Sequence, residues 1–453
     1  MEGHREGRVS RRGFSSPQLL SLPSFAFNPG HNPLFMKLRN QLIALACLLI
    51  FAALGVVYVR MWGWVQKPRQ IVVFVSDALS ARSLAAARLY AGGADHQFEL
   101  ERFPHSALLR NASEDYAVPD IASAATALAT GRKSRHGAVA TTGTGRALDT
   151  ILERAAKAGR AVGLITNGSL ASPSIAAFYA HSNRPDQSEF VALQLYERDW
   201  VRVAFGGGAA EFLPDGAVEG AEGKRKDGRD GRRKDGRDLV KEWQEKGVQV
   251  VWSKAELENA RGGESGRVVG LFGAGPLAYA SQMTPQPSLA DMTRRAIQLL
   301  GGQRGGYVLV VDAALFTSAS EGNLAEAALS EVLALDKAVR AAVEEAGEKA
   351  LILAVGRQSS GGLTLSGKVG REAKLSTLLG VAPEGYSYLS WASGPNGPLE
   401  GKLGPRKEPA AIQSAAGLGV AEDMLGLGRG PGSERVRGFL DNTAVFEILK
   451  SAL

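Results

Sequence analysis

The chain has 453 residues, of which 45% are hydrophobic and 22% are charged. These proportions are typical of a globular protein, and the length allows one large α/β domain or two ordinary domains. The formal net charge of +7 would suit a nucleic-acid-binding protein, but residues 1–69 alone hold nine Lys and Arg against two Glu. Residues 70–453 are therefore neutral overall and offer no basic face, which excludes a nucleic-acid partner.

An apolar segment follows the basic leader formed by residues 1–40. The stretch from Gln41 to Val59 holds nineteen uncharged and mostly apolar residues, which is enough for one helical crossing of a bilayer. Residues 41–60 are therefore predicted to be a transmembrane anchor; a cleaved signal peptide is the alternative, and a start at Met36 stays open. A single apolar segment behind a basic leader is typical of export, so the large domain is expected on the periplasmic side.

Four apolar runs farther along the chain have the composition of buried strands. They lie in residues 69–80, 161–166, 307–314 and 349–356. Residues 324–347, between the last two runs, have the 3.6-residue apolar spacing of a long helix. Strands that alternate with helices favour an α/β fold with a mostly parallel central sheet and helices on both faces. Such a sheet binds ligands beyond the carboxyl ends of its strands.

Two stretches of the large domain, residues 70–453, differ from this pattern. The sequence RKDGRD occurs at 225–230 and again at 233–238, with mixed charge and no apolar residue. It is predicted to be a solvated loop before a helix that begins at Leu239. Residues 366–435 are rich in Gly, Pro and Ser and are predicted to form a smaller inserted subdomain.

Seven motifs resemble segments of the alkaline phosphatase family in the family's own order. They are VVFVSDALS (72–80), YAVPDIASAATALATGRKS (116–134), SPSIAAFYAH (172–181), FGGG (205–208), RRKDGRDLV (232–240), PSLADMTRRAIQLL (287–300) and RGFLDNTAVFEIL (437–449). The resemblance covers the chain from about residue 70 to its end. It implies the alkaline phosphatase fold and a homodimer, whereas function has to be argued from the site.

The resemblance also implies a chemistry that can be checked residue by residue. In that family two zinc ions and a magnesium ion lie at the strand ends, and a serine attacks the phosphorus. Alignment on Asp120 and on Thr130-Gly131 puts Ile121 in the nucleophile's place, and isoleucine has no lone pair to offer. Ser123 lies two residues on, about 200° around a helix, so its side chain is expected to point away.

The places of the family's zinc ligands hold other residue types. An Asp and a His are replaced by Thr317 and Glu321, and an Asp-His pair is replaced by Arg357 and Gln358. All six histidines lie at or before His181, so no realignment recovers one in the second half of the chain. Zinc is therefore predicted to be absent. Arg357 would put a positive charge where the family binds a metal cation. It is either an electrostatic replacement for that metal or a substitution that arose by random drift.

The places of the family's magnesium ligands still carry oxygen atoms. They fall on Asp77, on Asp312 and on a serine, which is Ser172 if Ser-Pro stands for the family's Thr-Pro and Ser174 if one counts back from His181. Hard oxygen ligands suit Mg²⁺, so a magnesium site at Asp77, Ser172 and Asp312 stays open. Alternatively, Asp312 caps a helix or pairs with Arg357.

One cation remains a candidate for contact with an anion. The family's substrate-binding arginine falls on Pro185, with Arg184 beside it. A small shift of this loop would let Arg184 contact a phosphate-containing ligand, so such a ligand stays open.

Two functions follow from these substitutions. The first is a membrane-anchored, catalytically inactive homologue that acts by binding or as a structural partner. The alternative is a phosphomonoesterase with a rebuilt site, using Ser123 or a water with one metal at Asp77 and Asp312. On the first hypothesis, the small residues after Ile121 are kept for packing, and Ile121→Ser alone creates no phosphatase activity.

Overall fold

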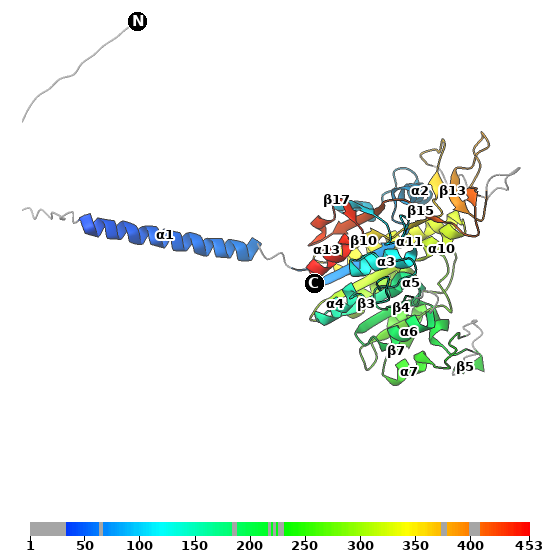
Figure 1. The fold of residues 1–453 in the computed structure, drawn as a ribbon, viewed down its shortest axis with the longest axis horizontal. Helices are drawn as coiled ribbons and strands as arrows, with labels where there is room; N and C mark the ends of the chain where they lie inside the picture. The colour runs from blue at the N-terminus through cyan, green and yellow to red at the C-terminus, as the bar shows by residue number, and fades with distance from the viewer. Residues whose placement is uncertain are drawn as a thin grey trace, which may run out of the picture. The chain divides into compact units, whose positions relative to one another are not determined.

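A computed structural model describes residues 33–62, 67–183, 188–215, 219–220, 223–224, 231–372, 378–397 and 408–453. The chain divides into two units, Met1–Trp64 and Val65–Leu453, which are taken separately. In the first unit, helix α1 spans Pro33–Trp62, drawn in blue in Figure 1. Its segment Met36–Tyr58 has the length and composition of a membrane span, and its side chains are unburied.

The second unit is built on a ten-stranded sheet. Its strands are, in spatial order, β17 (Gly438–Asp441), β2 (His105–Arg110), β16 (Met424–Arg429), β10 (Leu351–Gly356), β1 (Gln70–Ser76), β9 (Tyr307–Ala313), β3 (Ala161–Ser169), β4 (Val201–Gly207), β8 (Val268–Leu271) and β7 (Gln249–Val251). Neighbouring strands are parallel except at β16, which runs antiparallel to β10 and β2. The mostly parallel sheet predicted from the apolar runs is confirmed.

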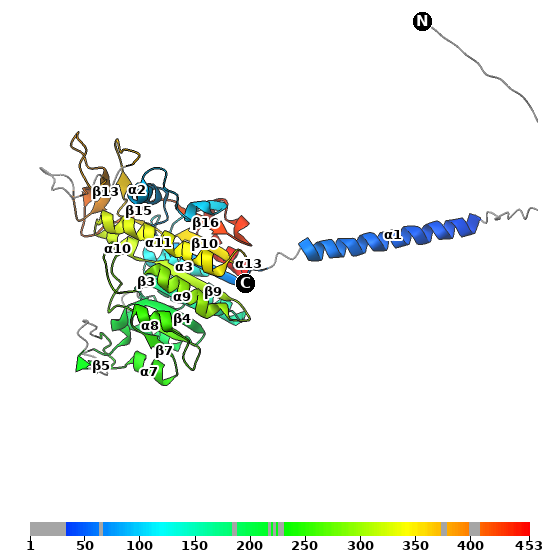
Figure 2. The same ribbon diagram turned by 180° about the vertical axis from the view of Figure 1, so that it is seen from behind.

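Helices cover both faces of this sheet. Helices α2 (Ala81–Gly92), α9 (Leu289–Gly301) and α11 (Ala325–Ala346) contribute to one core, together with Val72 and Phe74 of β1. Helices α3 (Ile121–Thr130), α4 (Ile151–Lys157) and α13 (Ala444–Ala452) contribute to the other core, with Val73 and Val75. Figures 1 and 2 show these two layers from opposite sides. Alternate residues of a strand point to opposite faces, so β1 serves both cores.

Shorter elements complete the second unit. The other helices within the described ranges are α5 (Pro173–Ala176), α6 (Ser188–Glu197), α7 (Leu239–Glu245), α8 (Lys254–Asn259) and α10 (Leu315–Glu321), with 3₁₀ turns at Leu100–Arg102, Ala209–Phe212 and Ser433–Arg435. Small sheets are formed by β12 (Thr364–Leu365), β13 (Leu389–Gly394) and β14 (Ala410–Gln413), by β11 (Ser359–Ser360) and β15 (Gly419–Val420), and by β5 (Glu219–Gly220) and β6 (Gly223–Lys224). Within the range expected to be an insertion, β16 lies in the central sheet instead.

The repeated basic segment is only partly solvated. Its first copy, 225–230, lies outside the described residues. In the second copy the side chain of Arg233 is 2% exposed and pairs with Asp235. It also donates hydrogen bonds to the backbone carbonyl oxygens of Glu189 and Glu211. The five donors of a guanidinium can satisfy such buried acceptors, so the expectation of a wholly solvated loop is wrong here, while α7 begins at Leu239 as predicted.

Candidate functional site

Three central strands bring two carboxylates and a guanidinium to the same edge of the sheet. Asp77 directly follows β1, Asp312 is near the end of β9, and Arg357 directly follows β10. The register aligns Val75 with Asp312 and Ser76 with Gly356. The carboxyl ends of parallel strands are where open α/β sheets bind ligands, so this edge is the candidate site.

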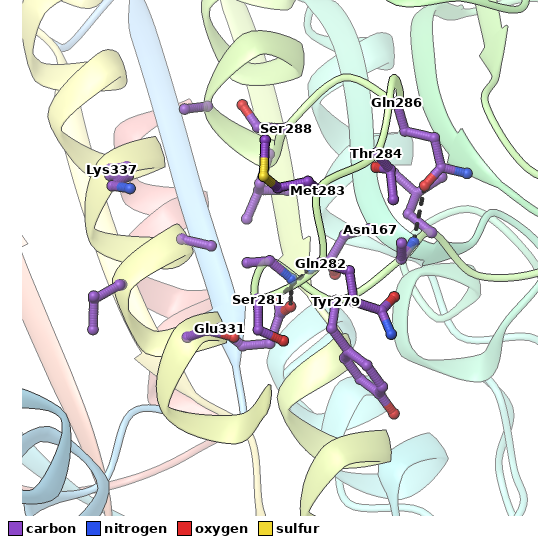
Figure 3. Close-up of a pocket in the computed structure, with 18 of the residues that line it drawn as sticks. Asn167, Tyr279, Ser281, Gln282, Met283, Thr284, Gln286, Ser288, Glu331 and Lys337 are labelled. Carbon is purple, nitrogen blue, oxygen red and sulfur yellow. Dashed lines mark hydrogen bonds between the residues drawn. The ribbon is translucent and has the colours of Figure 1, made fainter. Parts of the chain in front are cut away.

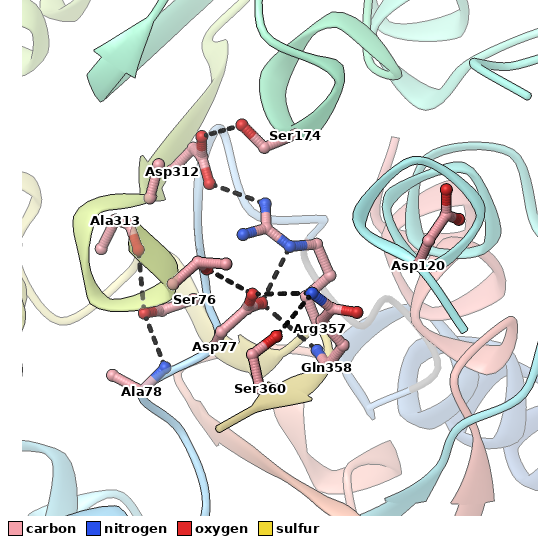
Figure 4. Close-up of polar contacts among 12 residues, drawn as sticks. Ser76, Asp77, Ala78, Asp120, Ser174, Asp312, Ala313, Arg357, Gln358 and Ser360 are labelled. Atoms are coloured by element: carbon pink, nitrogen blue, oxygen red, sulfur yellow. Dashed lines mark hydrogen bonds and ion pairs between the residues drawn. The ribbon is translucent and has the colours of Figure 1, made fainter. Parts of the chain in front are cut away.

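Arg357 lies between the two carboxylates and bridges them. Its Nε donates to Oδ1 of Asp77 and its Nη1 donates to Oδ1 of Asp312, each at 2.9 Å, as Figure 4 shows. All three side chains have no exposed surface. A planar guanidinium can bind two carboxylates at once and stays protonated when buried. One cation therefore links three strands in the interior of the protein.

Hydroxyl and amide groups occupy the other carboxylate oxygen atoms. Oδ2 of Asp312 accepts hydrogen bonds from Ser174 Oγ at 2.7 Å and from Thr166 Oγ1 at 3.0 Å. Oδ2 of Asp77 accepts one from Thr317 Oγ1. Burial raises the pKa of Asp312, although the charge of Arg357 and these hydrogen bonds act in the opposite direction.

The two serine candidates for a metal ligand have different positions. Ser174 contacts Asp312 directly, whereas Ser172 Oγ lies 2.6 Å from Ser174 Oγ and reaches Asp312 only through it. Thr166, which the motif comparison does not single out, contacts the same carboxylate oxygen as Ser174. No sequence signal marks it, because a threonine at the end of a buried strand is ordinary.

The residues present do not fit a metal ion between Asp77 and Asp312. The guanidinium takes Oδ1 of both carboxylates, and the hydroxyl donors point their hydrogen atoms at Oδ2. Within the described ranges, no three His, Cys, Asp or Glu side chains come together as a metal-binding group. A metal at this place would have to displace Arg357 first.

Helix α3 presents its N-terminus to the same edge. Asp120 is its N-cap: Oδ1 accepts hydrogen bonds from Ser123 N at 2.9 Å and Ser123 Oγ at 2.6 Å, and Oδ2 accepts one from Gly137 N at 2.7 Å. Ser123 is buried and held by this cap, away from the site. The residues from Ala122 to Thr130 are all buried, so the small-residue run serves close packing of the helix.

A cavity of about 490 Å³ opens in front of α3. It is lined by Val118, Pro119, Asp120, Ile121, Ala122, His136, Pro173, Glu321, Gln358, Ser360, Gly417 and Gly419. Ile121 is half-buried and forms part of this wall instead of filling the space. The motif comparison singles out neither His136 nor Ser360, although Ser360 lies two residues after the aligned position Gln358. Arg184 lies outside the described residues.

A second cavity, of about 510 Å³, lies between the segment 277–290 and α11. Figure 3 shows Glu331 at this cavity, near Ser281. Its Oε1 accepts a hydrogen bond from Ala280 N at 2.7 Å, and its Oε2 accepts one from Asn167 Nδ2 at 2.9 Å. Burial raises the pKa of Glu331 to about 7. Since Asn167 follows Thr166, this carboxylate connects to the Asp312 network.

Known proteins resemble the chain in both sequence and fold. The family model for alkaline phosphatase matches residues 68–376. The chain is 27% identical to alkaline phosphatase 4 of Drosophila melanogaster, over 73% of this chain and 63% of that protein. It is 29% identical to the membrane-bound alkaline phosphatase of Bombyx mori, over 61% and 57%. The chain thus spans about three fifths of these two relatives.

Two further similarities extend over most of both chains. Alkaline phosphatase 4 of Bacillus subtilis is 25% identical over 84% of this chain and 89% of that protein. The structure of Thermus thermophilus alkaline phosphatase matches with a TM-score of 0.68 and 25% identity, covering 85% and 91%. Alkaline phosphatase from the Antarctic bacterium TAB5 matches in fold, with a TM-score of 0.67 and 19% identity over 85% and 98%. A mutant of the TAB5 enzyme holds magnesium in its M3 site.

Proposed function

The chain belongs to the alkaline phosphatase family, and from this membership we propose that it is a non-catalytic member that acts by binding. Arg357 carries the proposal. Its guanidinium takes one oxygen of Asp77 and one of Asp312, the residues that the resemblance aligns with metal ligands. A permanent cation there replaces the charge of a metal but supplies no open coordination position, which metal-ion catalysis requires.

The nucleophile's place supports the same proposal. Ile121 has no group that can attack phosphorus, and Ser123 Oγ is 2.6 Å from the capping carboxylate of Asp120. A serine nucleophile needs a base or a metal to activate it. Asp120 is already the acceptor of three hydrogen bonds that hold α3 in place. The hydroxyl therefore serves the helix cap.

The location of the protein belongs to the proposal as well. The apolar helix α1 is a membrane anchor, and the family domain lies outside the cytoplasm. By family resemblance the chain forms a homodimer. The competing function is a phosphomonoesterase with a rebuilt site, in which Mg²⁺ replaces Arg357 between Asp77 and Asp312.

Metal content and turnover test the proposal. The full chain is purified in detergent, equilibrated with Zn²⁺ and Mg²⁺, dialysed, and assayed for bound metal and for hydrolysis of an aryl phosphate. The expected result is far less than one metal ion per chain and no hydrolysis above the rate of a buffer blank. Ile121→Ser is expected to behave in the same way, because it restores a hydroxyl without an activating group.

The variant Asp77→Asn separates intrinsic activity from a contaminating phosphatase. Turnover that disappears in Asp77→Asn would overturn the proposal and support the rebuilt site. Turnover that is unchanged in this variant belongs to a contaminant and leaves the proposal standing.

A further inference from the structure

The cavity in front of α3 is lined by acidic side chains. Asp120 and Glu321 line it, and Asp77 and Asp312 lie behind it with the single guanidinium of Arg357 between them. Among the described lining residues there is no lysine or arginine. Burial and the negative charge of Asp77 both raise the pKa of Glu321, as expected where cationic compensation is incomplete.

Gln358 directs an unpaired acceptor into this cavity. Its side chain is 96% buried, and its Nε2 donates to Oδ2 of Asp77 at 3.4 Å and to Oγ of Ser360 at 3.3 Å. A carboxylate oxygen can only accept, so the amide nitrogen must face Asp77 and the amide oxygen must face away from it. In the described part of the chain no donor reaches that oxygen, and Gln358 lines the cavity.

Glu321 is a second acceptor without a partner. It ends α10, lines the cavity, and is half-buried. Among the described residues no hydrogen bond or ion pair holds its carboxylate. Burying an unpaired carboxylate is costly, and a ligand that brings a positive charge and N–H donors offsets that cost.

We propose that this cavity binds an organic cation, the ammonium or guanidinium group of an alkyl amine. The head group lies beside Glu321 and the amide oxygen of Gln358. The alkyl part packs on the apolar wall that Val118, Ile121 and Pro173 form. This ligand class rests on the proposed non-catalytic function, because a working phosphatase site has to attract an anion.

The same charges disfavour a phosphate monoester. A dianion in the cavity would lie near four carboxylates and only one guanidinium. The carboxylates repel a negatively charged ligand and attract a positively charged one, and this effect is stronger in a partly buried site than in water. The volume of about 490 Å³ accommodates the side chain of a basic residue or a small polyamine. The cationic group can therefore come from a free amine or from a peptide.

Calorimetric titration of the full chain in detergent tests the inference, with agmatine as the free amine and acetyl-Gly-Arg-Gly-amide as the peptide. The expected result is saturable binding of at least one probe, weakened by added salt. Glu321→Gln is expected to weaken it about tenfold or more, since one partner of a desolvated charge pair is lost. Tighter binding of agmatine indicates a free amine, and tighter binding of the peptide indicates a protein partner.

A matched control and an anion complete the design. Glu348→Gln removes an exposed carboxylate elsewhere and is expected to bind as the wild type does. Binding of inorganic phosphate without binding of either cation would overturn the inference, as would Glu321→Gln binding like the wild type. The same preparations are assayed for aryl phosphate hydrolysis. Hydrolysis overturns the proposed function itself, whereas absent cation binding without hydrolysis overturns only the ligand class.

Discussion

At the scale of single residues, Arg357 determines what the strand ends can do. Its charge compensates Asp77 and Asp312, both of which are fully buried. A buried ion pair adds little net stability compared with an apolar replacement of the whole group, but removing one partner leaves uncompensated charge. The burial of each of these three charged side chains therefore depends on the presence of the other two.

Replacement of Arg357 by methionine is expected to lower the free energy of unfolding by about 3–5 kcal/mol, because two carboxylates lose their cation. Urea unfolding of the full chain in detergent measures this change. The triple variant Arg357→Met, Asp77→Asn, Asp312→Asn also removes the two carboxylate charges. It is expected to recover part of the lost free energy of unfolding. A loss that persists fully in the triple variant would show that packing of the arginine stem dominates.

Arg357→Met also creates a set of hard oxygen ligands. The carboxylates of Asp77 and Asp312, together with the hydroxyl of Ser174, suit Mg²⁺. Added Mg²⁺ is therefore expected to raise the melting temperature of the variant and to leave that of the wild type unchanged. An equal rise in the wild type would mean that Mg²⁺ competes with Arg357 in the native protein.

The residues that form the Arg357 ion pairs could be anticipated from the sequence. The arrangement of the hydroxyl groups around Asp312 could not. The sequence allowed Asp312 to be either a magnesium ligand or a partner of Arg357, and the structure contains the ion pair. The position of Thr166 against Asp312 depends on the register of β3 and β9, and that of Ser174 depends on how α5 packs beside them. Register is a long-range property, which local spacing does not determine.

At the scale of elements, Glu331 ties three parts of the fold together. It lies on α11, accepts a hydrogen bond from Ala280 in the segment before α9, and accepts another from Asn167 in β3. Asn167 Oδ1 in turn accepts a hydrogen bond from Ala314 N, after β9, at 2.7 Å. One buried carboxylate thus couples a loop, a helix and two strands.

Glu331 is expected to make stability depend on pH. Its pKa is about 7 in the folded protein against 4.5 for an ordinary glutamate, so the folded state binds more protons between these values. The contribution of Glu331 to the free energy of unfolding therefore falls as the pH rises from 4.5 to 7. Relative to the wild type, Glu331→Gln is expected to gain about 2–3 kcal/mol between pH 5 and pH 8.

Unfolding curves at pH 5, 6, 7 and 8 measure this difference directly. Other buried acids, such as Glu408, titrate equally in both proteins and cancel. Glu348→Gln replaces an exposed residue. Its free energy of unfolding is expected to change with pH as that of the wild type does, at all four pH values. If the free energy of unfolding of Glu331→Gln also changed with pH as that of the wild type does, Glu331 would not titrate in this range.

The element boundaries show where sequence patterns are insufficient. The apolar runs predicted β1, β9 and β10 because these strands are buried on both faces. Strand β16, with the sequence MLGLGR, lies in residues 366–435, for which the high content of Gly, Pro and Ser predicts an insertion. A Cβ at Gly426 would lie 3.2 Å from Leu109, so a neighbouring strand limits the side chain there. Such a tertiary cause leaves no local signal.

At the scale of the whole molecule, the chain combines an apolar helix with a domain of near-neutral charge. Replacing Leu48 and Leu49 by arginine puts two charges in the middle of the apolar stretch. Each is expected to cost about 2.5–3.5 kcal/mol on insertion, so the variant is expected to leave the membrane fraction on alkaline extraction while the wild type stays. Loss of the wild type from that fraction would contradict an anchor.

The mass of the mature chain separates the anchor from a cleaved signal. An anchored chain retains residues 41–60, and a processed one loses them together with the leader. Among the described residues, those of the hydrophobic cores all belong to the second unit, so a processed chain is expected to keep these cores.

The cation at the centre of the sheet is covalently part of the chain. A fold that depends on a bound metal gains stability that grows with the logarithm of the free ion concentration once the site is saturated, so its stability follows the supply of that ion. Arg357 arrives with the polypeptide at a fixed stoichiometry of one and cannot dissociate. On the proposed function, the protein is therefore expected to reach its folded state without added metal ions and to keep that state in the presence of a chelator.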